Sequence, residues 1–189
     1  EDRQKMSKSR GNVVNPWQMI EKYGVDVIRW HFYTVNPPGE PKKFDEADLG
    51  KTLRQFFMLA YNSFVFFQTY ASRKIPNSVR QPADQTPSRN ILDRWILARL
   101  NETVESATKN LNQYEIGDAA KSIENFLGDF SRWYIRRSRR RLQKPDPSVA
   151  GRKDYQSASA VLNCVLLELS KLLAPFAPFF AEFLYKSLG

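Results

Sequence analysis

Apolar residues recur at steps of three and four along two long stretches of this 189-residue chain. In residues 91–112 they are Leu92, Ile96, Leu100, Val104, Ala107 and Leu111. In residues 116–143 they are Ile116, Ala120, Ile123, Leu127, Phe130 and Tyr134. Such steps place an apolar stripe along one face of an α-helix, whereas a half-buried strand needs strict alternation. We therefore expect two long amphipathic helices, each packed against other helices.

Helix-capping residues and prolines predict further helices on both sides of this pair. Asp45 is expected to cap a long helix over residues 46–73. Another helix is expected from about Tyr155, with a kink or break at Pro175 and Pro178 and a short last helix over 179–187. The chain is thus expected to be mainly α, with a helical bundle over residues 46–189.

The first 45 residues are expected to form a smaller segment ahead of the bundle. Asn15 followed by Pro16 is typical of a helix start, and Gly24 of a helix end. Asp26 is expected to begin a second short helix. The proline-rich residues 36–41 break regular structure and mark the clearest boundary within the chain.

Composition excludes several classes of protein. A hydrophobic content of 42% supports a packed core, which excludes general disorder. Cys164 is the only cysteine, so neither an internal disulfide nor a cysteine-based metal site is expected, and we assign no metal ligand. No apolar run reaches the ~18 residues that a membrane span requires. No secretion signal is visible, and a cytoplasmic location is expected.

The segment Lys5-Met6-Ser7-Lys8-Ser9 has the chemistry of a polyphosphate clamp. Its two ammonium groups lie three positions apart, among serine hydroxyls that can donate hydrogen bonds to phosphate oxygens. Adenylyl transfer requires such groups, because negative charge builds up on the departing phosphates as the bond breaks. The other interpretation is a lysine- and serine-rich surface loop without a role.

Most of the net charge of +9 lies in one stretch. Residues 132–153 contain nine basic residues and a single acidic one, Asp146. The candidates for RNA contact are Arg132, Trp133, Arg136, Arg137, Arg139, Arg140, Arg141 and Lys144. Clustered like charges weaken an isolated helix, and a phosphate backbone relieves that repulsion. A solvated helix end and an anionic membrane surface are the alternatives.

The segment from Lys5 to Ser9 resembles the K-M-S-K-S signature of the class I aminoacyl-tRNA synthetases. Several other stretches resemble the isoleucine branch of that class. They are Gly11-Asn12-Val13-Val14-Asn15-Pro16, Tyr23-Gly24-Val25-Asp26, Pro37-Pro38-Gly39-Glu40-Pro41, Leu92-Asp93-Arg94-Trp95-Ile96-Leu97, the segment from Trp133 to Arg141, and the segment from Leu172 to Phe179. The valine enzymes and other class I branches remain alternatives, as does a free-standing RNA-binding helical module.

The resemblance implies a division of roles along the chain. Residues 1–45 then comprise the end of a catalytic core, with the lysine loop and a stem-contact segment, and residues 46–189 the anticodon-binding bundle. In that family the loop from Lys5 to Ser9 binds ATP with Mg²⁺, Lys8 steadies the pyrophosphate, and Lys5 assists. The implied partner is an isoleucine-accepting tRNA, bound by a monomer.

The second catalytic signature of the class, H-I-G-H, does not occur. His31 is the only histidine, it stands between Trp30 and Phe32, and it is expected to be a packed residue. The resemblance then implies that the nucleotide-binding sheet, the isoleucine pocket and the editing insertion lie upstream of Glu1. We expect the chain alone to be inactive.

Overall fold

The structure is a computed structural model that describes residues 6, 13–37, 39–42, 44–71 and 90–188. Helices make up the regular structure of these residues, and no strand occurs among them, so the mainly α expectation is confirmed. The elements are α1 (Pro16–Tyr23), α2 (Val25–Thr34), α3 (Glu46–Thr52), η2 (Leu53–Phe57), α4 (Met58–Tyr70), α5 (Ile91–Asn112), α6 (Ile116–Gly128), η6 (Asp129–Ile135), α7 (Arg136–Gln143), α8 (Val149–Leu173) and α9 (Pro178–Leu188).

Two of the expected long helices each contain a π-helical turn. Helices α3 and α4 are joined through η2 into one rod, and α6 and α7 are joined through η6 into a second rod. The second rod covers residues 116–143, as the apolar spacing predicts. The first ends at Tyr70, three residues before the predicted end. A π-helical turn inserts one extra residue into a helix, which changes the facing of the side chains beyond it.

Short-range hydrogen bonds set the helix starts. The side-chain oxygens of Asn15, Asp45 and Asn90 accept from backbone N–H groups at the beginning of α1, α3 and α5. Helix α8 begins at Val149, six residues before the expected start, because the Ser148 hydroxyl accepts from the Gly151 N–H at 3.0 Å. Residues 149–154 at the start of α8 are mostly exposed, so they carry no apolar periodicity that would reveal them.

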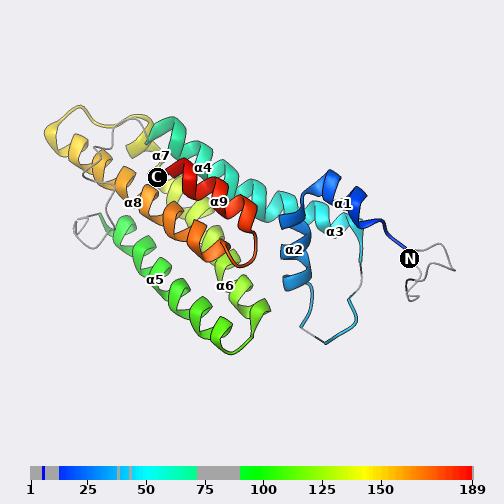
Figure 1. Ribbon diagram of the computed structural model, residues 1–189. Coiled ribbons are helices and arrows are strands. Elements are labelled where there is room, and N and C mark those ends of the chain that lie inside the picture. Colours follow the sequence, from blue (N-terminus) through cyan, green and yellow to red (C-terminus); the bar gives the residue numbers. More distant parts are fainter. Residues whose placement is uncertain (1–5, 7–12, 38, 43, 72–89, 189) are drawn as a thin grey trace.

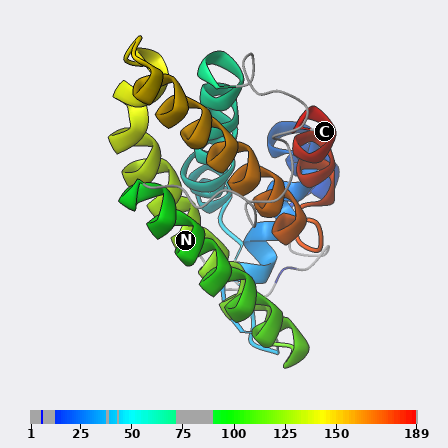
Figure 2. The same ribbon diagram turned by 90° about the vertical axis from the view of Figure 1, so that its left-hand side faces the viewer.

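The long helices pack lengthwise, and α1, α2 and the start of α3 lie at one end of them (Figure 1). Helices α5 and α6 form a hairpin, with Tyr114 at φ 61° in its turn. Helix α8 packs against α5, α7 and α9, and the rotated view shows α5 and α7 beside it (Figure 2). The central core residues include Ile123, Leu127 and Leu162, which are fully buried.

Helix α2 shares this core. The Trp30 ring stacks on Phe56 with centroids 3.8 Å apart and meets the edge of Phe176. Beside it, His31 is buried, as the sequence predicts, and burial lowers the pKa of its imidazole. A buried imidazole with a lowered pKa is neutral at neutral pH, as expected of a packed residue.

Two polar side chains of α2 hold the connection between α8 and α9. Asp26 accepts from the Phe180 N–H at 2.7 Å, at the start of α9, where the helix dipole favours a negative charge. Arg29 donates from Nε to the Phe176 carbonyl at 3.0 Å and from Nη2 to the Pro175 carbonyl at 3.2 Å. The segment that follows the lysine loop is therefore fixed to the bundle by hydrogen bonds as well as by ring packing.

Candidate nucleic-acid interface

The C-terminal part of the second rod presents a row of exposed cations. We define the basic row as the exposed residues Arg132, Arg136, Arg137, Arg139, Arg140 and Lys144. Within the described part of the chain, none of these side chains forms an ion pair with a carboxylate. Their charges therefore remain available to an external polyanion, and repulsion between them favours its binding.

An aromatic ring stands beside the basic row. Trp133 is 48% exposed, and the Arg137 guanidinium lies over its indole at 4.4 Å from the ring centroid. Tyr134, its neighbour, is fully buried, as the apolar spacing predicts. Of the two aromatic residues in this part of the rod, only Trp133 is placed to contact a ligand.

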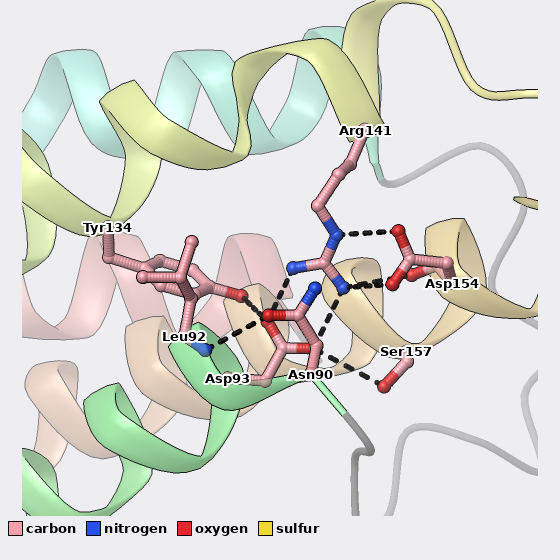
Figure 3. A network of polar contacts seen from close by, with 7 residues as sticks. All are labelled: Asn90, Leu92, Asp93, Tyr134, Arg141, Asp154 and Ser157. Carbon is pink, nitrogen blue, oxygen red and sulfur yellow. Dashed lines mark hydrogen bonds and ion pairs between the residues drawn. The ribbon is translucent and has the colours of Figure 1, made fainter.

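Arg141 does not belong to the exposed row, which corrects the expectation that it contacts RNA. Its side chain is only 13% exposed. The guanidinium donates from Nη1 and Nη2 to the two carboxylate oxygens of Asp93 at 2.7 and 2.9 Å, and it also pairs with Asp154 at 2.6 and 2.7 Å (Figure 3). A guanidinium held by two carboxylates is neutralised, and turning outward would take the paired cation away from the buried Asp93 carboxylate.

The Asp93 carboxylate is the centre of this network. Its side chain is fully buried, and it also accepts from the Tyr134 hydroxyl at 2.7 Å. Burial and the nearby Asp93 raise the pKa of Tyr134 well above its usual range, so the phenol stays neutral. Burial opposes the charge of Arg141, but hydrogen bonds to Asp93 and Asp154 outweigh it and raise its pKa. The network ties α7 to α5 and α8 and fixes the direction in which the basic row faces.

The sequence contains a signal for the inward position of Arg141. Continuing the apolar stripe from Tyr134 by steps of four and three leads to Ser138 and then to Arg141. Ser138 is fully buried, and Arg141 lies one helical turn beyond it. A charged residue on a buried stripe requires a buried partner, and Asp93 at the start of α5 supplies it.

The lysine loop lies almost entirely outside the described residues. Met6 is described and is 44% exposed, whereas Lys5, Ser7, Lys8 and Ser9 are not described. Their assignment as ATP ligands stays a prediction. Helix α1 begins four residues after the end of the undescribed segment, and α1 is tied to α3 by Lys22, which forms an ion pair with Glu46 at 2.6 Å.

A family model described as the anticodon-binding domain of tRNA ligase matches residues 93–189, about half of the chain. The chain belongs to this family. The matched part contains α6, α7, the basic row and the Asp93 network. A second model, described as tRNA synthetases class I (I, L, M and V), matches residues 1–44. The resemblance to class I synthetases is thereby confirmed.

Isoleucine–tRNA ligases are among the curated relatives of this chain. The enzyme of Dehalococcoides mccartyi (strain CBDB1) is 44% identical over 98% of this chain, which covers 18% of that protein. The enzyme of Thermus thermophilus is 37% identical over 98% of this chain and 17% of its own length. The chain thus spans about a fifth of the length of these relatives.

Solved structures show the same fold at lower identity. Mycobacterium tuberculosis methionyl-tRNA synthetase bound by methionyl-adenylate matches with a TM-score of 0.77 at 21% identity, over 95% of this chain and 35% of that one. A LeuRS–tRNA–LeuAMS complex from Agrobacterium radiobacter K84 matches with a TM-score of 0.63 at 19% identity, over 99% of this chain and 21% of that one. Of the described helices, none is both long and apolar enough to cross a bilayer.

Proposed function

We propose that this chain is the tRNA-binding part of an isoleucine–tRNA ligase, an enzyme that activates isoleucine with ATP and transfers it to its tRNA. The observation that supports this most strongly is the identity of up to 44% with isoleucine–tRNA ligases over nearly the whole chain. Residues 1–45 then form the end of the catalytic core and the stem-contact segment, and residues 46–189 form the anticodon-binding bundle. The enzyme acts as a monomer in the cytoplasm.

The bundle binds the tRNA through the basic row and Trp133. Arginine forks onto phosphate oxygens and stacks on bases, which suits a folded RNA with unpaired loops. Binding energy from this distant contact orients the acceptor end at the catalytic centre. Because the Asp93 network fixes α7, the row is organised before the tRNA arrives and little ordering cost accompanies binding.

The lysine loop contributes to the chemical step. Lys8, assisted by Lys5, stabilises the negative charge that develops on pyrophosphate as the isoleucyl-adenylate forms, while Met6, Ser7 and Ser9 complete the ATP contact. Within the described residues, no group of three His, Cys, Asp or Glu side chains is placed to hold a metal ion. In this proposal magnesium enters the complete enzyme bound to the phosphates of ATP.

The proposal is tested in the complete polypeptide that carries this chain. Isoleucine-dependent exchange of pyrophosphate into ATP, followed by charging of an isoleucine-accepting tRNA, is the expected activity. Equal activity with valine, or none with isoleucine, overturns the assignment of the amino acid. The isolated 189-residue chain serves as a control and is expected to show no exchange.

In the same polypeptide, Lys8→Ala is expected to slow adenylate formation by roughly 100- to 1000-fold, the typical effect of removing one group that stabilises transition-state charge. Isoleucine binding should change little, because Lys8 contacts only the leaving group in this proposal. Pre-steady-state adenylate formation and isoleucine affinity, measured side by side, separate the two effects. Equal losses in both contradict the assigned role, and Lys42→Ala provides a control for a lysine outside the loop.

A further inference from the structure

Helix α9 is capped by a residue of another helix. Its first residue, Pro178, has no backbone N–H, and Ala177 before it has no side-chain oxygen that could accept from the N–H groups of the first turn. Asp26 of α2 supplies that oxygen, because its Oδ2 accepts from the Phe180 N–H at 2.7 Å. The N-terminal cap of α9 thus lies 154 residues before the group that it accepts from.

The end of α8 is held from the same turn of α2. The carbonyls of Pro175 and Phe176, just beyond α8, accept from the Arg29 guanidinium at 3.2 and 3.0 Å. Arg29 follows Asp26 by three residues, so the two side chains share one face of α2. The carboxylate then lies at the positive end of α9 and the guanidinium at the negative end of α8. Together they fix α2 to the point where the two helices meet.

The Asp26 carboxylate is a costly way to cap a helix. It is buried, and within the described part of the chain no hydrogen-bond donor reaches its Oδ1. Burial raises the pKa of its carboxyl, although the Phe180 N–H and the charge of Arg29 oppose the rise. A buried polar atom without a partner lowers stability, and a neutral serine or asparagine caps a helix about as well. Such a departure from the most stable choice is expected where function requires the residue.

Helix α8 connects this contact with the basic row. Near the start of α8, Asp154 pairs with Arg141 of α7, the helix that carries most of the row. At its other end, α8 leads into the carbonyls that Arg29 holds. Figure 1 shows α8 running from the side of α7 towards α2. A helix of 25 residues is about 37 Å long and is a stiff connection, so polar contacts at its two ends set the position of α2 relative to the row.

We propose that Asp26 and Arg29 are positioning residues for the transfer of isoleucine to tRNA. Helix α2 follows the lysine loop and α1 in the chain, whereas the basic row lies at the far end of α8. With both side chains in place, a tRNA held by the row has its acceptor end at the catalytic centre. Without them, α2 keeps the ring contacts of Trp30 but loses its fixed angle to α8 and α9. The inference rests on the proposed function and adds two residues that contact neither ATP nor tRNA.

The test uses the complete polypeptide with alanine in place of both Asp26 and Arg29. Transfer of isoleucine from the preformed adenylate to tRNA, followed in a single turnover, should slow by roughly 10- to 100-fold, since a shift of about 1 Å at the reacting groups costs about 100-fold. The dissociation constant for tRNA and the rate of isoleucine-dependent pyrophosphate exchange should not change, because the row and the lysine loop are intact. A purely structural role would lower all three together.

Two further variants separate positioning from a loss of stability. Of the single changes at position 26, Asp26→Ala should be slow in transfer, whereas Asp26→Asn keeps an oxygen for the Phe180 N–H and should retain most of the rate. Tyr155→Phe is the matched structural control, because it removes the hydrogen bond from the Tyr155 hydroxyl to the Tyr70 carbonyl at 2.6 Å, which joins α8 to α4. This control should transfer isoleucine at the unchanged rate.

Three results would overturn the inference. The double variant could transfer isoleucine at the unchanged rate, it could lose tRNA affinity, exchange and transfer by the same factor, or Asp26→Asn could be as slow as Asp26→Ala. In each case the unchanged polypeptide still charges its tRNA, so the proposed function stands. Failure of the proposed function is seen separately, as the absence of isoleucine-dependent exchange in the unchanged polypeptide.

Discussion

Replacing Asp93 with alanine is expected to lower the free energy of unfolding by about 3 to 5 kcal/mol. The side chain is fully buried and accepts from both Arg141 and Tyr134. Its removal leaves the largely buried Arg141 with the partly exposed Asp154, and it removes the carboxylate that accepts from the Tyr134 hydroxyl. Urea denaturation at neutral pH measures the change.

The control for this prediction is an ion pair nearer the solvent. Asp129→Ala removes one of the two carboxylates that pair with Arg99, the other being Glu102. The side chains of Arg99 and Asp129 are both more than one-third exposed, so the change should cost less than about 1 kcal/mol. The double variant Asp93→Ala with Arg141→Ala should lose less than the sum of the two single changes, because it leaves no unpaired buried charge. A loss below about 1 kcal/mol for Asp93→Ala alone contradicts the assigned role of the network.

Neutralising four members of the basic row is the second change with a large expected effect. The variant carries alanine in place of Arg136, Arg137, Arg139 and Arg140. Its dissociation constant for tRNA should be about 100-fold higher near 0.1 M salt, because four phosphate contacts are lost. None of the four pairs with a carboxylate in the described part of the protein, so the fold should remain intact. Filter binding with the 189-residue chain measures the loss.

A charge-matched control separates local contact from a general effect of net charge. Alanine in place of Lys109, Lys121, Lys171 and Lys186 also removes four charges, but these exposed lysines are spread over α5, α6, α8 and α9. The control should weaken binding by only a few-fold. Equal losses in the two variants would show that the row has no special role in binding.

Local sequence patterns predict the helices well, and where the prediction fails there is a physical reason. The expected bounds 91–112 and 116–143 are confirmed, because both helices are half-exposed and their buried faces are regular. The early start of α8 escapes prediction because its first turns face solvent and depend on the Ser148 cap. The apolar spacing does not reveal the two π-helical turns either.

The sequence predicts which residues make up the candidate interface, but it predicts only in part which of their side chains face solvent. Six of the seven predicted cations are exposed, and the seventh, Arg141, lies on the buried stripe that continues from Tyr134. Its partner Asp93 lies 48 residues away in the sequence, so no local rule connects the two. A groove beside Trp133 escapes prediction for the same reason, since Gln55 and Glu124 come to line it only after the two rods pack together.

The dependence of tRNA affinity on salt tests the central claim most directly. The logarithm of the binding constant is measured against the logarithm of the salt concentration for two proteins. They are the unchanged 189-residue chain and the variant with alanine in place of Arg136, Arg137, Arg139 and Arg140. Each lost phosphate contact should reduce the slope by about one, so the slopes should differ by about three to four. Parallel lines of equal affinity would contradict the claim that these guanidinium groups bind the RNA backbone.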